Sequence, residues 1–334
     1  MTSSAARGEP TLVVGAGGLL GSAVVRAVRA RGGQVRTAAV PWHDVAAASE
    51  ELAQAVDGLL TVAGGGRWHI AWCAGAGVTA SSATQIADEV TTLRRCVDHM
   101  LEHSGPSLQA GRVFFASSAG ALYAGSSGAP FDESTTPVPL SAYGRGKLQM
   151  EEQVTRLATA GGARVMVGRL SNLYGPGQDL AKAQGLISQL CRAQLTGQPV
   201  GLYVSLDTVR DYLFVDDAAG LVLDGLSQLD AVCPPAGVVT KILAAQRSAS
   251  IAAVLGELRR LSRRKPVVRL SASPQAAVQA RDLRFRSTVW PELDRRPLTP
   301  LPVGIHATSH DLAARIMAGG LARGTHPDGT QASG

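Results

Sequence analysis

The stretch that decides the fold runs from Thr11 to Gly21 and reads TLVVGAGGLLG. It opens on a short apolar run, Thr11 to Val14, which is typical of a buried strand. The glycine-rich turn that follows leads into Ser22 to Arg31, which favours a helix closed by Gly32 and Gly33. Strand, glycine-rich turn and helix in this order form the context that a dinucleotide-binding turn requires.

The glycines of this turn have separate roles in the predicted cofactor site. Gly15 permits the tight turn, and Gly17 and Gly18 let the backbone approach a pyrophosphate. Gly21 lets the helix pack close to the sheet, and the helix N-terminus would face the anion. The alternative is a glycine-rich turn that binds no ligand. The residues predicted to hold the cofactor here are Gly15, Gly17, Gly18, Leu19, Leu20 and Gly21.

A second pattern, Tyr143-Gly144-Arg145-Gly146-Lys147, points to proton transfer. On a helix, positions i and i+4 share one face, so the phenol and the ammonium would lie side by side. A nearby cation favours the phenolate, and we therefore expect the pKa of Tyr143 to move towards neutrality. A tyrosine that titrates near working pH can exchange a proton with a sugar or alcohol oxygen.

The first half of the chain alternates between strand and helix patterns. The predicted strands after the first are Val35 to Val40, Trp68 to Cys73, Arg112 to Ala116 and Arg164 to Leu170. The predicted helices are Glu50 to Leu60, Ala87 to His103 and Ala142 to Ala160. This alternation predicts an α/β fold with a Rossmann-like, doubly wound parallel sheet.

After about Asn172 more Pro, Gly and short elements appear, which predicts a smaller substrate domain. We expect a flexible N-terminus at 1–10 and a dinucleotide-binding domain at 11–171. A C-terminal substrate domain at 172–316, interleaved with the core, and a flexible tail at 317–334 would follow.

Taken together, the glycine turn and the Tyr143–Lys147 pair resemble the extended short-chain dehydrogenase/reductases, the group of nucleotide-sugar epimerases, dehydratases and ketoreductases. The resemblance runs from about Thr11 to about Ile305. Further matching segments are Phe114–Ser118, Leu122–Tyr123, Pro130–Glu133, Pro137–Tyr143, Arg169–Gly177 and Arg210–Asp217. Each is modest alone, but the ordered set is specific.

The resemblance implies roles for the residues at matching positions. Tyr143 would be the acid/base, and Lys147 would lower its pKa and hold the nicotinamide ribose. Ser118 would donate a hydrogen bond to the reacting oxygen, with Ser117 as the fallback if the register is off by one. Ser117 and Ala74 would also border the cofactor. For Ser118 the alternative is a strand-end serine bonded to backbone.

The same resemblance implies a substrate site for a nucleoside diphosphate sugar. Asn172 would meet its phosphates, and Arg210 could pair with the diphosphate in the forked geometry of a guanidinium. Arg281 is a weaker candidate for the same group. The alternative for Arg210 is an internal ion pair with Asp211. Asp216 and Asp217 would mainly be structural, as caps of a helix that begins near Ala218.

Several positions depart from the family pattern. Ala39 stands where NAD-binding members carry an acid, so the cofactor would be NAD or NADP, with NADP slightly favoured. Arg36 could supply charge to a 2′-phosphate. The segment Trp42 to Asp44 would replace a full third strand. Glu89 stands where the family often has Asn, which leaves the proton relay open.

The departure after Ser118 narrows the reaction. The 4,6-dehydratases carry an Asp-Glu pair directly after the catalytic residue, whereas Ala119 and Gly120 follow here. A second acid for the elimination of water is missing, so dehydration is not expected. The prediction is an NAD(P)-dependent epimerase or ketoreductase acting on a sugar carbon, C4. The alternative from another class is a catalytically weak nucleotide-binding sensor or scaffold on the same fold.

Composition limits the other classes. The 334 residues carry a net charge of +6, but the densest basic cluster, Arg259 to Lys265, is best read as a solvated helix face, so we expect no nucleic-acid binding. Four scattered cysteines and seven scattered histidines form no metal-ligand pattern. With no apolar run of about twenty residues, we expect no membrane span and a cytoplasmic protein. The resemblance alone implies a homodimer through the two long helices.

Overall fold

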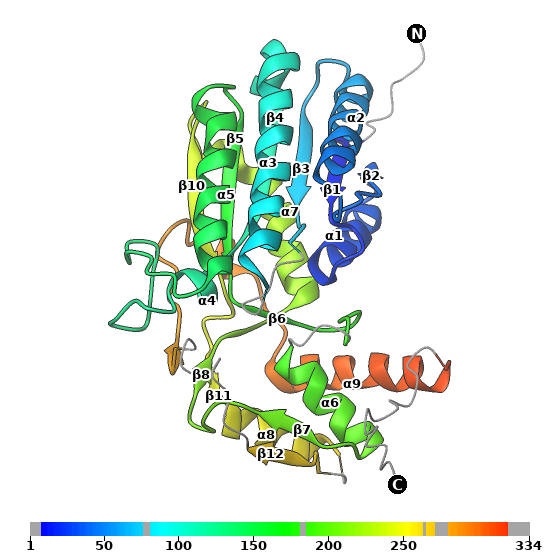
Figure 1. Cartoon of the computed structure of the whole chain (residues 1–334), viewed down its shortest axis with the longest axis vertical. Helices are drawn as coiled ribbons and strands as arrows, with labels where there is room; N and C mark the ends of the chain where they lie inside the picture. The colour runs from blue at the N-terminus through cyan, green and yellow to red at the C-terminus, as the bar shows by residue number, and fades with distance from the viewer. Residues whose placement is uncertain (1–7, 76–80, 181–184, 263–264, 271–279, 320–334) are drawn as a thin grey trace, which may run out of the picture.

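A computed structural model of the chain describes residues 8–75, 81–180, 185–262, 265–270 and 280–319. Most of the expected flexible ends, 1–10 and 317–334, lies outside these residues. A six-stranded parallel sheet dominates the structure, in the order β10-β5-β4-β3-β1-β2 (Figure 1). Its strands are β1 Thr11–Val14, β2 Val35–Thr37, β3 Trp68–Trp72, β4 Gly111–Ser118, β5 Arg164–Leu170 and β10 Val238–Leu243.

Helices cover both faces of this sheet, because neighbouring strand residues point to opposite sides. Val13 and Phe114 belong to the core shared with α1 Leu19–Ala30 and α7 Val215–Val232. The adjacent residues of each strand belong to the core beneath the helices on the other face. Those helices are α2 Val45–Ala63, α3 Ala83–His103 and α5 Ala142–Thr159. The predicted doubly wound α/β fold is therefore confirmed.

The observed bounds of β2 and α2 differ from the predicted bounds. β2 ends at Thr37 rather than at Val40, and it is the edge strand of the sheet. α2 begins earlier than expected because the Asp44 carboxylate accepts hydrogen bonds from the backbone of Ala46 and Ala47. Trp42 packs edge-on against Trp72, with ring centroids 6.5 Å apart. The segment between β2 and α2 thus turns without a third strand, as predicted.

The second half of the chain contributes to two regions. α7 and β10 return to the large sheet, so the predicted interleaving is present, although the exact domain boundaries stay a prediction. The helices α6 Leu186–Thr196, α8 Ile251–Leu261 and α9 Leu301–Met317 share a separate apolar core. Figure 1 places this smaller group beyond the end of the sheet towards which β3 points.

Short strands complete the smaller group. β6 pairs with β9, β7 pairs with β12, and β8 lies between β11 and β13. Their bounds are β6 Asn172–Tyr174, β7 Val200–Leu202, β8 Val209–Arg210, β9 Tyr212–Phe214, β11 Ala249–Ser250, β12 Val268–Leu270 and β13 Asp282–Leu283. The carboxyl ends of the large sheet therefore face this group, and this is the edge where open α/β sheets bind ligands.

Candidate active site

The glycine turn between β1 and α1 is shaped by close backbone contacts. Gly15 has φ +84°, and a Cβ atom there would lie 2.7 Å from the backbone nitrogen of Ala74. A Cβ at Gly21 would lie 2.1 Å from the Gly15 carbonyl oxygen. Gly15 is therefore needed for its conformation and for contact with the end of β3. Gly21 allows the helix to close on the turn itself, rather than on the sheet as expected.

The rest of the turn leaves room for a ligand. No atom lies within 4 Å of the position that a Cβ would take at Gly17, so packing within the chain does not require glycine there. Gly18 is the N-cap of α1, no side chain caps this end, and its first turn holds no acid. The side chains of Leu19 and Leu20 join the apolar core, which leaves their backbone for any contact with an anion. An exposed, uncapped helix N-terminus fits a pyrophosphate.

α5 brings Tyr143 and Lys147 together at the carboxyl end of β4. Its N-cap is Ser141, whose hydroxyl accepts from the backbone of Gly144 at 3.1 Å. The buried Lys147 Nζ donates to the Ala116 carbonyl at 3.1 Å and lies 5.8 Å from the centre of the Tyr143 ring. A Cβ at Gly75 would lie 3.2 Å from this nitrogen. The ammonium therefore reaches under the turn that follows β3.

Two glycines on either side of Arg145 let α5 approach its neighbours. A Cβ at Gly144 would lie 2.7 Å from the Ala121 carbonyl oxygen of α4, Ala119–Leu122. A Cβ at Gly146 would lie 2.2 Å from the Cγ2 atom of Ile86 on α3. The sequence pattern singled out the tyrosine and lysine, but the glycines between them turn out to seat the helix between α3 and α4.

The expected shift of the Tyr143 pKa is wrong for this structure. Burial raises the pKa of Tyr143 to about 12, and the Glu89 carboxylate acts in the same direction. A hydrogen bond with Ser118 opposes this rise. Burial also lowers the pKa of Lys147, while Glu89, Glu151 and Cys73 oppose that shift. The sequence argument counted the cation and omitted the desolvation of the phenol.

Ser118 and Ser117 point in different directions because they are neighbours on one strand. Ser118 ends β4, caps α4 by accepting from the backbone of Ala121 at 3.3 Å, and hydrogen bonds with Tyr143. The same hydroxyl thus makes the backbone bond of the alternative and also contacts Tyr143. The buried Ser117 hydroxyl donates to Glu151 at 2.5 Å instead. Ser117 therefore does not replace Ser118 beside Tyr143, and only its backbone could meet a cofactor.

The structure brings together two of the three residues predicted to bind the phosphates of the substrate. β8 carries Arg210 and pairs with β13, and the Arg281 carbonyl accepts from Val209 and from Arg210. The Arg281 guanidinium forms an exposed ion pair with Asp207. The third residue, Asn172, begins β6, and its exposed side chain donates to the Asp211 carbonyl at 3.0 Å. All three therefore belong to the smaller group of elements and not to the large sheet.

Two predicted roles near this site are corrected. The buried Asp211 carboxylate accepts from the backbone of Ala245 and Arg247, so it orders that loop and does not pair with Arg210. Burial raises the pKa of Asp211 and lowers that of Arg210. Asp217 is structural as predicted, but it accepts from the backbone of Thr299 at 2.6 Å rather than capping α7.

The region for the adenosine ribose carries no free acid at the predicted position. Asp44, the nearest acid, is engaged in capping α2. The Arg36 guanidinium lies against Gly58, in the second half of α2, where a Cβ would meet it at 2.9 Å. Arg36 is thus directed along α2 and away from the helix start that follows β2. This position of the Arg36 guanidinium does not support the predicted contact with a 2′-phosphate.

The described part of the chain contains no candidate metal cluster and no candidate membrane-spanning helix. No group of three or more His, Cys, Asp or Glu residues that could hold a metal ion occurs there. Within the same residues, no helix is long and apolar enough to cross a membrane.

The sequence of the chain is similar to a known family and to individual known proteins. The family model described as the NAD dependent epimerase/dehydratase family matches residues 11–236. A dTDP-4-dehydro-6-deoxyglucose reductase from Escherichia coli is 31% identical over 106 residues, which cover 32% of this chain and 33% of that protein. A putative UDP-glucose 4-epimerase from Methanocaldococcus jannaschii is 33% identical over 108 residues, which cover 32% and 35%. The matched segment spans about a third of the length of each of these relatives.

Solved structures resemble the chain over nearly its whole length. MoeE5 in complex with UDP-glucose and NAD has a TM-score of 0.74 and 22% identity, and the match covers 92% of this chain and 99% of that one. The UDP-glucose 4-epimerase of Thermus thermophilus in complex with NAD has a TM-score of 0.72 and 21% identity, and covers 91% and 99%. These likenesses establish the fold.

Proposed function

Because the chain belongs to the NAD-dependent epimerase/dehydratase family, we propose that it is an NAD(P)-dependent epimerase or ketoreductase that acts on a nucleoside diphosphate sugar. The observation that carries this proposal is the meeting of Ser118, Tyr143 and Lys147 at the carboxyl ends of β3 and β4. The open glycine turn and the end of β3 meet through Gly15 and Ala74 at the same edge. A bound nicotinamide dinucleotide would supply the hydride donor or acceptor.

The residues of the chain would move the proton. In the reducing direction, Tyr143 Oη gives its proton to the carbonyl oxygen at C4, and Ser118 donates a hydrogen bond to the same oxygen. In the oxidising direction, the Tyr143 phenolate takes the hydroxyl proton of the sugar. The positive charge of Lys147 favours that phenolate. The Lys147 Nζ atom is held in place by its hydrogen bond to the Ala116 carbonyl. Burial keeps Tyr143 protonated, and its hydrogen bond with Ser118 opposes the rise of its pKa.

The substrate side rests on the arginines of β8 and its neighbours. Arg210 is half-buried and Arg281 is exposed, and the pairing of β8 with β13 keeps their backbones together. Two guanidinium groups on adjacent segments suit the two phosphates of a nucleoside diphosphate. Asn172 follows β5 closely, at the start of β6, and would add an amide contact.

Cofactor choice, assembly and location belong to the proposal as well. The similar structures of MoeE5 and of the Thermus thermophilus UDP-glucose 4-epimerase contain NAD, which gives no support to the slight preference for NADP. A homodimer through α3 and α5 is implied by the resemblance. Of the large apolar side chains that stand exposed in the described residues, none lies on α3 or α5, so such an interface would be mainly polar. A cytoplasmic location stays a prediction.

The deciding experiment is to denature the purified chain and identify any dinucleotide released by chromatography and mass. Retained NAD supports an epimerase, which has no need to release its cofactor between turnovers. An empty protein that binds NADPH or NADH reversibly supports a ketoreductase. A protein that binds none of these favours the scaffold alternative, to which the sequence departures at Glu89 and Ala39 also point.

A second experiment separates catalysis from binding. Tyr143→Phe removes the proton-carrying oxygen and leaves the ring in place. We expect cofactor affinity to stay within about twofold and turnover to fall about 10²–10⁴-fold. Turnover close to that of the unaltered protein would remove Tyr143 from the acid/base role.

A further inference from the structure

One face of α5 continues beyond the two proposed reaction residues. Tyr143, Lys147 and Glu151 follow each other at intervals of four, so they lie along the same side of the helix. Glu151 is buried, with 8% of its surface exposed. Its Oε1 atom accepts from Ser117 Oγ at 2.5 Å and from Arg169 Nε at 3.1 Å. Its Oε2 atom accepts from Arg169 Nη2 at 2.7 Å.

Arg169 extends these contacts to a fourth segment. Its Nη1 atom donates to the Tyr123 hydroxyl at 2.7 Å, and the guanidinium carbon lies 5.6 Å from the centre of that ring. Tyr123 is fully buried and stacks on Phe131, with ring centroids 5.6 Å apart. In the register of β4 and β5, Arg169 stands directly beside Ser117. We refer to Ser117, Tyr123, Glu151 and Arg169 as the Glu151 network.

The Glu151 network joins the segments that carry the proposed site. Ser117 precedes Ser118 on β4, Tyr123 closes the short helix α4 that Ser118 caps, and Glu151 shares α5 with Tyr143 and Lys147. Arg169 stands on β5, which leads to Asn172. A buried ion pair is weak evidence for added stability, because its desolvation cancels much of the attraction. Its position between β4, α4, α5 and β5, the segments that carry Ser118, Tyr143 and Lys147 or lead to Asn172, therefore calls for another explanation.

We propose that Glu151 and Arg169 are positioning residues that fix the rotation of α5 against β4 and β5, and so aim Tyr143 and Lys147 at the reacting atoms. This inference rests on the proposed function. The forked, two-bond contact between carboxylate and guanidinium resists rotation better than a single bond does. Side chains of a helix end roughly 6 Å from its axis, so a rotation of about 10° would move them by about 1 Å. Displacements of that size can cost about a hundredfold in rate.

The Glu151 network also acts on Lys147 by charge. The Glu151 carboxylate raises the pKa of Lys147, against the lowering by burial. Two substitutions separate the positioning from the charge. Glu151→Gln keeps the shape and removes the negative charge, whereas Arg169→Lys keeps the positive charge and loses the fork.

The test measures the site directly as well as turnover. The chain has five tyrosines, so labelling with ¹³C at the tyrosine Cζ gives a small set of signals, and Tyr143→Phe assigns the one from Tyr143. Arg169→Lys and Glu151→Gln should both shift the Tyr143 signal and lower kcat at least tenfold with little change in KM. Glu151→Gln alone should also move the alkaline limb of the pH profile to lower pH, because Lys147 loses its supporting charge.

A matched control comes from the opposite end of the sheet. Asp230→Asn weakens the ion pair with the buried Arg112 and should lower the melting temperature without moving the Tyr143 signal. The proposal is overturned if Arg169→Lys and Glu151→Gln only lower the melting temperature, like Asp230→Asn, and leave the Tyr143 signal in place. Should either fail to fold, Ser117→Ala removes one contact of the network and must give the same shift on a smaller scale. The Tyr143 signal decides even if the proposed reaction proves wrong, so the two failures can be told apart.

Discussion

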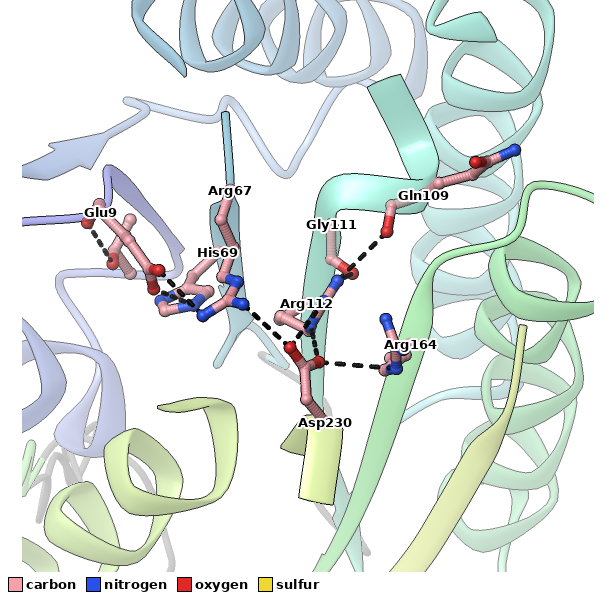
Figure 2. Close-up of polar contacts among 9 residues, drawn as sticks. Glu9, Arg67, His69, Gln109, Gly111, Arg112, Arg164 and Asp230 are labelled. Atoms are coloured by element: carbon pink, nitrogen blue, oxygen red, sulfur yellow. Dashed lines mark hydrogen bonds and ion pairs between the residues drawn. The ribbon is translucent and has the colours of Figure 1, made fainter. Parts of the chain in front are cut away.

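Two buried cations at opposite ends of the parallel sheet, Arg112 and Lys147, are held in different ways. At the amino end, Arg112 is 5% exposed and forms an ion pair with Asp230, which also contacts Arg67 at 3.0 Å and Arg164 at 3.5 Å (Figure 2). At the carboxyl end, Lys147 is 3% exposed, and its hydrogen bond goes to the Ala116 carbonyl. The Glu89 and Glu151 carboxylates raise the pKa of Lys147, against the lowering by burial.

This difference indicates that the cations at the amino end stabilise the fold, whereas Lys147 is available to act on Tyr143. At the amino end the three arginines are balanced by Asp230 and Glu9, as the dashed contacts of Figure 2 show. These contacts tie the starts of β3, β4 and β5 to the end of α7. At the carboxyl end, desolvation lowers the pKa of Lys147 and raises that of Tyr143. Perturbed groups of this kind gather where a chain carries out chemistry, because stability is given up there for reactivity.

The largest effect is expected at Lys147. Lys147→Met replaces a buried cation by an apolar side chain of similar length, so we expect turnover to fall about 10²-fold or more. The melting temperature should stay the same or rise, because the desolvation of the ammonium is relieved. Turnover assays and thermal melts check both. A clear loss of thermal stability would mean that Lys147 is a structural cation like Arg112.

The opposite outcome is expected at the amino end. Arg112→Met leaves Asp230 without its buried partner and frees the carbonyl groups of Gln109 and Gly111. We expect the free energy of unfolding to fall by about 1–3 kcal/mol. Turnover measured below the melting transition should change less than twofold. Urea denaturation gives the first quantity, and a tenfold loss of turnover would contradict the division between the two ends.

A smaller effect is expected at Glu89. Its carboxylate raises the pKa of Tyr143, which burial brings to about 12, so Glu89→Gln should make Tyr143 ionise at lower pH. Alkaline difference absorbance against Tyr143→Phe measures this ionisation. Glu102→Gln, an exposed position near the end of the same helix, is the control. Equal titration curves for the two variants would show that Glu89 does not act on Tyr143.

The smallest effect concerns His69 at the amino end. Burial lowers its pKa, although Glu9 opposes this shift, with the His69 Nε2 and Glu9 Oε2 atoms 3.0 Å apart but not aligned for a hydrogen bond. The folded chain therefore takes up this proton at lower pH than the unfolded chain. Stability should fall as the pH drops from about 6.5 towards the folded pKa.

His69→Gln tests this pH dependence. The variant should flatten the dependence of urea midpoints on pH below about 6.5. Turnover should be unaffected, because His69 lies at the start of β3 and far along the strand from Gly75. If the urea midpoint of His69→Gln depended on pH as steeply as that of the unaltered protein, other groups would be responsible for the loss of stability at low pH.

Much of the fold and part of the candidate site follow from local sequence. β1 and β5 begin and end where the pattern placed them, since continuous apolar runs mark strands buried on both faces. Tyr143 and Lys147 meet because helical geometry fixes the distance between positions i and i+4. The need for glycine at position 15 follows from the turn because its φ of +84° favours glycine, whereas its contact with Ala74 is tertiary.

The remaining features needed the packed molecule. The sequence contains Glu151 and Arg169, but only the pairing of β4 with β5 beneath α5 brings them together. Ser117 and Ser118 are adjacent and identical in type, so only the orientation of β4 in the folded chain decides which of them reaches Tyr143. The pKa of Tyr143 depends on how much water the surrounding elements exclude. Local conformation is set by neighbours along the chain, whereas burial, charge partners and side-chain direction are set by segments that meet only when the chain has folded.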